Sequence, residues 1–263
     1  MGATLGPEAI LVPASTILGG MIGARFFKGQ KELVSLLAAA GLIALFTAFF
    51  HSFWIGLLSL VLVLSQSKAK FKPVMLLIAA IASAASYVTL HFIEAKPYVE
   101  LPGGTFNLDA VSVILGLTLI VVGYGMEMLL AALHTLIAKL KKNKQLKDWM
   151  VRSIVASLGL AILFLIGGPL VEFTGNKSIM PMFDEAAKLG LGGLLWILVI
   201  KIVAISWSKA IGYRGGMIFP VIFLASVVVA IVQLYIPEFN VAFGVIAILA
   251  GALFANKKNH ILA

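Results

Sequence analysis

A glutamate near the start of the chain stands where it could compete with an anion. Glu8 follows Gly6 and Pro7 and opens the charge-free run Ile10–Gly23. A helix that begins at Pro7 leaves its first backbone N–H groups without partners, and its aligned peptide dipoles place about +0.5 charge there. Such a start binds anions, and the carboxylate of Glu8 can occupy the same position until it is protonated or displaced. A first-turn acid that only complements the helix dipole is the alternative.

A second stretch of the same kind lies near the other end of the chain. Residues 212–220 read Gly-Tyr-Arg-Gly-Gly-Met-Ile-Phe-Pro, and the apolar run Val221–Ile236 follows directly. A lipid bilayer cannot satisfy the N–H groups that such a break exposes, so the break is predicted to bind a ligand. Paired Gly/Pro breaks in two halves of a chain are typical of inverted-repeat transporters. A simple kink at Gly215, Gly216 and Pro220 is the alternative.

The two breaks together predict an anion-binding site with Glu8 as its gate. The residues assigned to it are Gly6, Glu8, Ala9, Gly215, Gly216, Met217, Ile218 and Phe219. No metal site is predicted, because cysteine is absent and neither His51 nor His91 has a second histidine three or four residues away. We expect no enzyme and no cofactor, since the sequence lacks H-E-x-x-H, paired membrane aspartates and a G-x-S-x-G with a partner histidine.

The elements that position these residues are predicted to be membrane helices. Of the 263 residues, 61% are hydrophobic and only 12% are charged, which places the chain far from an average soluble domain. The net charge of +9 does not indicate nucleic acid, because the basic residues lie in short loops between apolar runs. The sequence therefore predicts an all-α, multi-pass protein of the cell membrane.

The apolar runs give the expected helices and their direction. The runs are Ala9–Ala24, two short helices that turn back within Leu33–Leu64, Pro73–Ile93, Ala110–Ala138, Ser153–Val171, Leu189–Ser208, Met217–Ile236 and Val241–Ala255. This order places 16 of the 20 Lys and Arg residues on one side, which the positive-inside rule makes the cytoplasmic side. These 16 are Arg25, Lys28, Lys31, Lys68, Lys70, Lys72, Lys139, Lys141, Lys142, Lys144, Lys147, Arg152, Lys209, Arg214, Lys257 and Lys258.

The two helices that begin at the breaks then run in opposite senses, as an inverted repeat requires. We expect a single transmembrane domain over residues 1–263, with residues 1–93 in the first repeat and residues 108–263 in the second. Two charged residues lie within the apolar runs. We interpret Lys201 as a snorkelling or helix-packing lysine, and Glu127 as a structural residue rather than a proton relay.

Several motifs, taken in order, resemble those of the CLC family of chloride channels and transporters. Residues 201–220 resemble the segment that carries the family's G-I-F-A-P signature. Gly6–Ile10 resembles the G-[KR]-E-G-P signature, with Glu8 in the place of the gating glutamate. Ala39–Phe46 resembles the stretch A-A-G-L-A-A-A-F, and Gly168-Pro169 with Gly175 resembles the P-x-x-x-G turn before the second signature.

This resemblance implies a CLC-like inverted-repeat fold with broken and tilted helices, and transport of chloride or another small halide across the lipid bilayer. It also implies pairing as a homodimer, to which Phe223, Val227 and Ile231 could contribute an apolar interface; lipid contact explains these residues equally well. No nucleic-acid partner is expected.

The chain also departs from the family pattern. The serine loop and the helices before it would precede Met1, and the helix with the pore tyrosine would lie beyond Ala263. Leu58 or Ser59 stands where the exchangers carry an inner proton-transfer glutamate. We therefore expect passive conduction rather than proton-coupled exchange. The alternative is a non-transporting fragment or subunit that needs the missing segments for activity.

Overall fold

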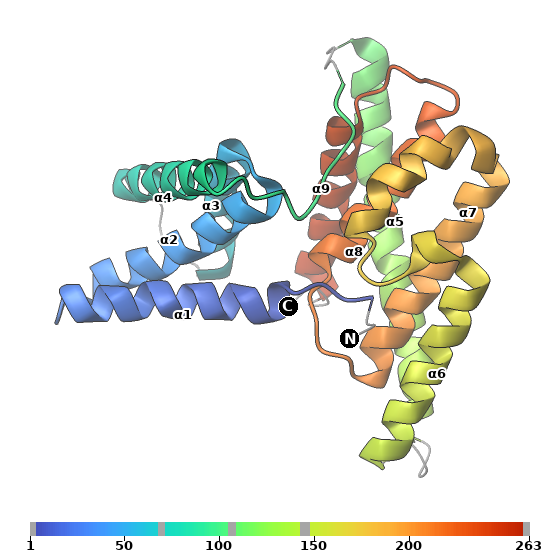
Figure 1. The fold of residues 1–263 in the computed structure, drawn as a ribbon, viewed down its shortest axis with the longest axis horizontal. Helices are drawn as coiled ribbons and strands as arrows, with labels where there is room; N and C mark the ends of the chain where they lie inside the picture. Colours follow the sequence, from blue (N-terminus) through green and yellow to red (C-terminus); the bar gives the residue numbers. More distant parts are fainter. Residues whose placement is uncertain (1–3, 68–71, 105–108, 143–147, 260–263) are drawn as a thin grey trace. The chain divides into compact units, whose positions relative to one another are not determined.

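The computed structural model describes residues 4–67, 72–104, 109–142 and 148–259 (Figure 1). Helices dominate these residues, and one isolated bridge is the only β-type pairing among them. Six of the helices are long and apolar enough to cross a membrane. The prediction of an all-α, multi-pass membrane protein is confirmed. Among the basic residues assigned to the inner side, Lys68, Lys70, Lys144 and Lys147 lie outside the described residues.

The chain divides into two compact units. The amino-terminal unit is Pro7–Val99, and the carboxy-terminal unit combines Met1–Gly6 with Glu100–Ala263. The division falls close to the point at which the sequence was expected to pass from one repeat to the next. The inverted-repeat relation between residues 1–93 and 108–263 stays a prediction.

Four helices build the amino-terminal unit: α1 (Glu8–Phe26), α2 (Lys31–Phe50), α3 (Phe53–Ser67) and α4 (Pro73–Phe92). Helix α2 packs against the other three. The predicted pair of helices within Leu33–Leu64 is confirmed as α2 and α3, which turn back at His51 in the left-handed region with a φ of 48°.

Glycine lets α1 and α2 pack backbone against backbone. A Cβ atom added at Gly19 would lie 2.2 Å from the carbonyl oxygen of Leu37, and one at Gly41 would lie 2.3 Å from that of Ser15. Such close approach is typical of membrane helices, in which packing and not a hydrophobic driving force holds helices together. The two helices therefore form a rigid hairpin.

Five helices build the carboxy-terminal unit: α5 (Ala110–Ala138), α6 (Trp149–Gly167), α7 (Ile179–Ile211), α8 (Ile218–Gln233) and α9 (Val241–Asn259). Short 3-10 turns accompany them: η1 (Lys139–Lys142), η3 (Pro169–Val171) and η4 (Asn176–Ser178). Helix α7 packs against α5, α6 and α8, and α9 packs against α5 and α8. Nearly every side chain from Phe219 to Ala230 of α8 is buried, so α8 forms the centre of this unit.

Helix α7 is longer than the predicted run Leu189–Ser208. It begins at Ile179 and is interrupted at Gly190, where the backbone is not helical (φ 59°, ψ −172°). The charged residues Asp184, Glu185 and Lys188 were expected in a loop, but they lie in the part of α7 before this kink. These charged residues set the start of the predicted apolar run at Leu189, but the helix itself begins ten residues earlier, at Ile179.

The predicted subunit interface on α8 is wrong for two of its three residues. Phe223 and Val227 are fully buried inside the carboxy-terminal unit. The turn between α6 and α7 covers this face, because a Cβ added at Gly175 would lie 2.5 Å from the Phe223 ring. The ammonium of Lys201 lies 4.8 Å from the centre of the same ring.

Lys201 is a packing lysine and does not snorkel to a membrane surface. Its side chain is fully buried, and Nζ donates to the carbonyl oxygens of Val171 at 2.8 Å, Glu172 at 3.3 Å and Phe173 at 2.6 Å. These carbonyls belong to the last residue of η3 and to the two residues after it. Lys201 therefore supplies the donors that this turn needs inside the unit.

Candidate functional site

The glycine-rich stretch is a true break between two helices. Helix α7 ends at Ile211, and its cap Gly212 adopts a φ of 107°, a left-handed conformation that glycine takes at no steric cost. Residues 212–217 then run without helix until α8 begins at Ile218. The predicted interruption before the apolar run is confirmed.

The start of the chain is anchored on α7 beside this break. The hydroxyl of Thr4 lies 2.7 Å from the hydroxyl of Ser208 and donates to the carbonyl oxygen of Ala204 at 3.2 Å. Thr4 is fully buried. Sequence reasoning missed these contacts, because a single threonine and a single serine about 200 residues apart carry no shared pattern.

Gly6 and Gly216 then join the two stretches directly. The N–H of Gly6 donates to the carbonyl oxygen of Gly216 at 2.8 Å, and the N–H of Gly216 donates to that of Gly6 at 2.9 Å. The two residues form an isolated antiparallel bridge. This pairing brings together the backbones of two stretches that the sequence marked independently as breaks.

Glycine is required at position 215 by this close approach. A Cβ atom there would lie 2.4 Å from the Cβ of Leu5 and 3.2 Å from the carbonyl oxygen of Gly6. The first distance is shorter than real Cβ contacts. Any larger residue at Gly215 therefore forces the amino-terminal segment away from the break.

A helix starts two residues after each of the paired glycines. Helix α1 begins at Glu8 and α8 begins at Ile218, and neither start has a side-chain cap. The first intrahelical bonds run to the carbonyl oxygens of Pro7 and Met217. By helix geometry the N–H groups before those bonds have no partner within the helix. The N-cap side chains of Pro7 and Met217 do not supply acceptors for these donors.

The predicted site residues differ in burial. Glu8 is 4% exposed, Met217 is 4% exposed and Phe219 is 1% exposed. Gly215, Gly216 and Ile218 are half-buried, Gly6 is buried, and Ala9 is exposed. The structure brings Gly6, Gly215 and Gly216 together, while Glu8 takes its place as the first residue of α1 and Pro7 as the cap before it.

The two helices that begin at the breaks differ in length. Helix α8 has 16 residues, fewer than a full membrane crossing needs. Helix α1 has 19 residues and spans about 28 Å at 1.5 Å per residue, so by length it could cross a membrane alone. Helix α1 is three residues longer than the predicted run Ala9–Ala24, and α8 is four residues shorter than the predicted run Met217–Ile236.

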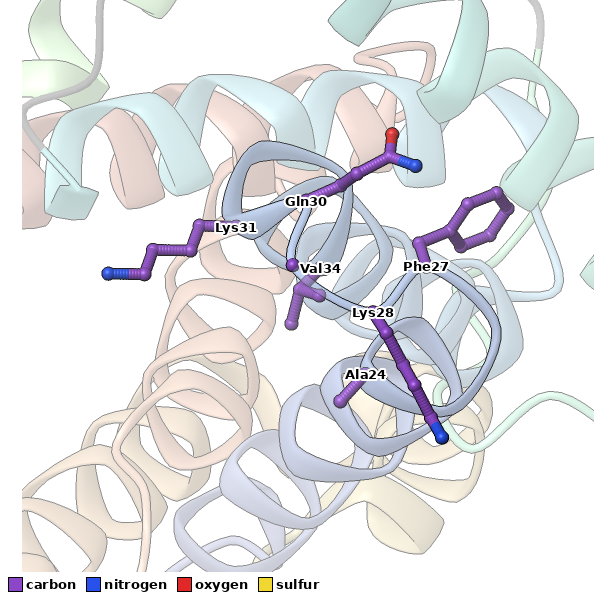
Figure 2. Close-up of a pocket in the computed structure, with 7 residues that line it drawn as sticks. Ala24, Phe27, Lys28, Gln30, Lys31 and Val34 are labelled. Carbon is purple, nitrogen blue, oxygen red and sulfur yellow. The ribbon is translucent and has the colours of Figure 1, made fainter.

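A separate hollow of about 390 Å³ lies at the turn between α1 and α2 (Figure 2). Its lining includes Lys28, Lys31, Gln30 and Phe27. Figure 2 shows the side chains of Lys28 and Lys31 pointing away from each other. Because the two ammonium groups do not converge, this hollow is not an anion site of the predicted kind. No group of three metal-binding side chains occurs among the described residues.

Comparison with known proteins points to one family. A model of the voltage gated chloride channel family matches residues 1–256. Among curated proteins, the chain is 29% identical over 238 residues to proteins of Salmonella newport and Salmonella typhimurium that are named "Putative ion-transport protein YfeO". The match covers 86% of this chain and 54% of each relative. The chain thus spans about half the length of the curated relatives it matches.

Proposed function

Because this chain belongs to the voltage-gated chloride channel family, we propose that it carries chloride or another small anion across a membrane. The anion is bound by backbone N–H groups at the starts of α1 and α8, and the carboxylate of Glu8 is the gate. The residues that supply the site are those at the two breaks: Gly6, Glu8, Ala9, Gly215, Gly216, Met217, Ile218 and Phe219.

The observation that carries this proposal is the bridge between Gly6 and Gly216. Each glycine stands two residues before a helix, and neither helix start has a side-chain cap. A helix start concentrates about half a positive charge and several outward N–H groups. The bridge therefore joins the segment that precedes α1 in the chain to the segment that precedes α8.

Backbone donors suit this task better than a charged side chain. Burying a bare anion in a medium of low dielectric costs many kcal/mol unless several donors compensate it. An arginine or lysine would hold the anion too firmly for transport, whereas passage requires binding that is weak enough to release. Partial charges spread over several N–H groups meet both requirements.

Glu8 is suited to act as a gate because it occupies the first position of α1 and is almost fully buried. A carboxylate there is attracted by the same helix dipole that attracts an anion. When the carboxylate is protonated or displaced, this attraction is lost and the anion can take its place. Opening is therefore expected to depend on pH and on anion concentration.

Passive conduction is favoured over proton-coupled exchange. The resemblance places the inner proton-transfer acid of the exchangers near Leu58 or Ser59. Leu58 is 64% exposed, and the hydroxyl of Ser59 donates to the carbonyl oxygen of Gly56 at 2.6 Å. Neither side chain can bind and release a proton near neutral pH.

A second candidate follows from the chain's length relative to its relatives. Because it spans about half of each relative, the chain could serve as a subunit that conducts only together with a second chain. Flux that appears only when the partner is added would support this alternative over conduction by the chain alone.

The proposal is tested by anion efflux from proteoliposomes that contain the full chain. We expect chloride or fluoride efflux from the wild type, larger and less pH-dependent efflux from Glu8→Ala, and a raised, pH-independent efflux from Glu8→Gln, which mimics the protonated acid. Glu32→Gln is the matched control, since Glu32 is an exposed acid paired with Lys72 and is expected to leave efflux unchanged. No efflux from any folded variant would overturn the proposal, and equal efflux from all would remove the role of Glu8.

A further inference from the structure

A buried acid lies on α5 in the carboxy-terminal unit. Glu127 on α5 has no exposed surface, and within the described part of the chain neither of its carboxylate oxygens has a hydrogen-bond partner. A carboxylate without donors inside a protein is costly, whereas a neutral carboxylic acid is far less so. Its surroundings decide which form it takes.

The packing of α5 explains why Glu127 is enclosed. Helices α5 and α9 run side by side (Figure 1), and a Cβ atom added at Gly123 would lie 2.0 Å from the carbonyl oxygen of Ile248. The reverse contact places a Cβ at Gly251 1.9 Å from the carbonyl oxygen of Ile120. Backbones this close leave little room for water. Glu127 follows Gly123 by four residues and therefore lies on the same face of α5.

The residues of α9 opposite this position offer no polar partner. Continuing the contact between Gly123 and Ile248 by one turn brings Glu127 level with Ala252, and Ala255 follows one turn later; both alanines are buried. No residue from Val241 to Ala255 has an ionisable side chain. On this side Glu127 meets only apolar surface.

Charged groups of both signs lie on α7, which packs against α5: Asp184, Glu185 and Lys188 precede the kink at Gly190, and Lys201 and Lys209 follow it. Lys209, in the last turn of α7, interacts electrostatically with Glu127. Lys201 of the same helix donates hydrogen bonds to the carbonyl oxygens of residues 171–173. The η1 turn carries Lys139, Lys141 and Lys142, which begin 12 residues after Glu127, about 18 Å along a helix. On α5 itself, His134 lies two turns further on.

We propose that Glu127 is a proton-binding site of the carboxy-terminal unit: a carboxylic acid that is neutral in the resting protein and releases its proton toward the side of Lys209. A Ca²⁺ or Mg²⁺ ion does not fit, because such ions take six or more oxygen ligands and Glu127 alone offers two. The step is a simple dissociation, in which the O–H bond breaks, the proton leaves and the carboxylate is stabilised by the positive charge of Lys209. This site is independent of Glu8 and does not rest on anion transport.

Infrared spectroscopy of the purified full chain tests the proposal without any transport measurement. We expect a carboxylic acid C=O band at neutral pH, well above pH ~4.3, where an ordinary glutamic acid has lost its proton. The band should disappear in Glu127→Gln and move without disappearing in Glu127→Asp, and it should remain in Glu32→Gln. A neutral-pH spectrum that is the same in the wild type and in Glu127→Gln would overturn the proposal.

Two further measurements apply if Glu127→Gln proves hard to purify. Lys209→Gln should keep the acid band to a higher pH than the wild type, because the charge that stabilises the carboxylate is gone; an unchanged titration would overturn the role of Lys209. Thermal stability gives an independent readout. Glu127→Gln should melt close to the wild type if the acid is neutral, whereas a strong loss of stability would show an ionised acid paired with Lys209 and would overturn the proposal.

Discussion

Helices α6 and α8 differ in how the backbone N–H groups of their first turn are placed and capped. Helix α6 begins at an exposed position, where the carboxylate of Asp148 accepts a hydrogen bond from the N–H of Met150 at 2.7 Å. Helix α8 begins at a buried position after Met217, whose side chain makes no cap hydrogen bond. A helix start that faces water can be satisfied by water or by a fixed acid. In our proposal, the buried start of α8 contributes its N–H groups to the anion site.

Helices α5 and α1 repeat this contrast. Asp109 caps α5 by accepting a hydrogen bond from the N–H of Ser112 at 2.8 Å. Helix α1 follows Pro7, which cannot cap through a side chain, and its first acid is the buried Glu8. Helices α2 and α4 also lack side-chain caps, but they begin at exposed lysines where water or lipid headgroups can serve. Burial together with a missing N-cap side chain is shared by α1, α8 and α7, whose first residue Ile179 is buried and whose N-cap Ser178 makes no cap hydrogen bond. Helix α7 differs from the other two because it directly continues the 3-10 turn η4.

Lys201 offers the strongest test of the rule that buried backbone groups need partners. Replacing it by methionine keeps the length of the stem and removes the donor for three carbonyls. Since each unsatisfied buried group costs about 1–3 kcal/mol, we expect a loss of roughly 3 kcal/mol in the free energy of unfolding. Thermal unfolding in detergent measures it. Lys188→Met is the control, because Lys188 is exposed on the same helix. Equal stability of the two variants would show that these carbonyls need no donor.

A methyl group at Gly215 tests whether the uncapped starts depend on the bridge between Gly6 and Gly216. The new Cβ would overlap Leu5, so we expect Gly215→Ala to lose about 2 kcal/mol of stability and any anion efflux that the wild type shows. Gly192→Ala on α7 is the matched control, because a Cβ there meets nothing within 4 Å. Alanine in that helix should be neutral or slightly stabilising. Wild-type efflux from Gly215→Ala would separate the bridge from the function.

The sequence predicted most helices because charge-free runs mark them without reference to the rest of the fold. Ala110–Ala138 is found with the predicted limits, and Pro73–Ile93 ends one residue earlier in the structure. It failed at α7, where Gly190 kinks the helix and charged residues continue it. An apolar run predicts the part of a helix that lies in the membrane, but it does not predict the charged turns by which the helix continues beyond that run.

The site was predicted only in its local parts. Each glycine break can be recognised alone, because glycine and proline interrupt an apolar run. The bridge between Gly6 and Gly216 joins residues 210 positions apart, and the carbonyls that receive Lys201 lie 28–30 residues before it. Such contacts depend on how helices pack and leave no periodic signal. For the same reason the sequence could not show that Glu127 lacks a hydrogen-bond partner.

Unfolding at acid pH tests the side-chain cap that Asp109 provides at the start of α5. The side chain and backbone N–H of Ser112 hydrogen-bond the carboxylate of Asp109 and hold the pKa of that carboxyl below its ordinary range. A group whose pKa is lower in the folded state contributes its stabilisation above its unfolded pKa, about 3.9, and loses it as the pH falls through the folded pKa. We therefore expect wild-type stability to fall in this acid window relative to Asp109→Asn, which caps the helix without titrating. The difference between the two proteins should be constant from about pH 5 upward. Thermal unfolding across this range measures it, and a difference that changes near neutral pH would contradict the assignment of Asp109 as an ionised cap.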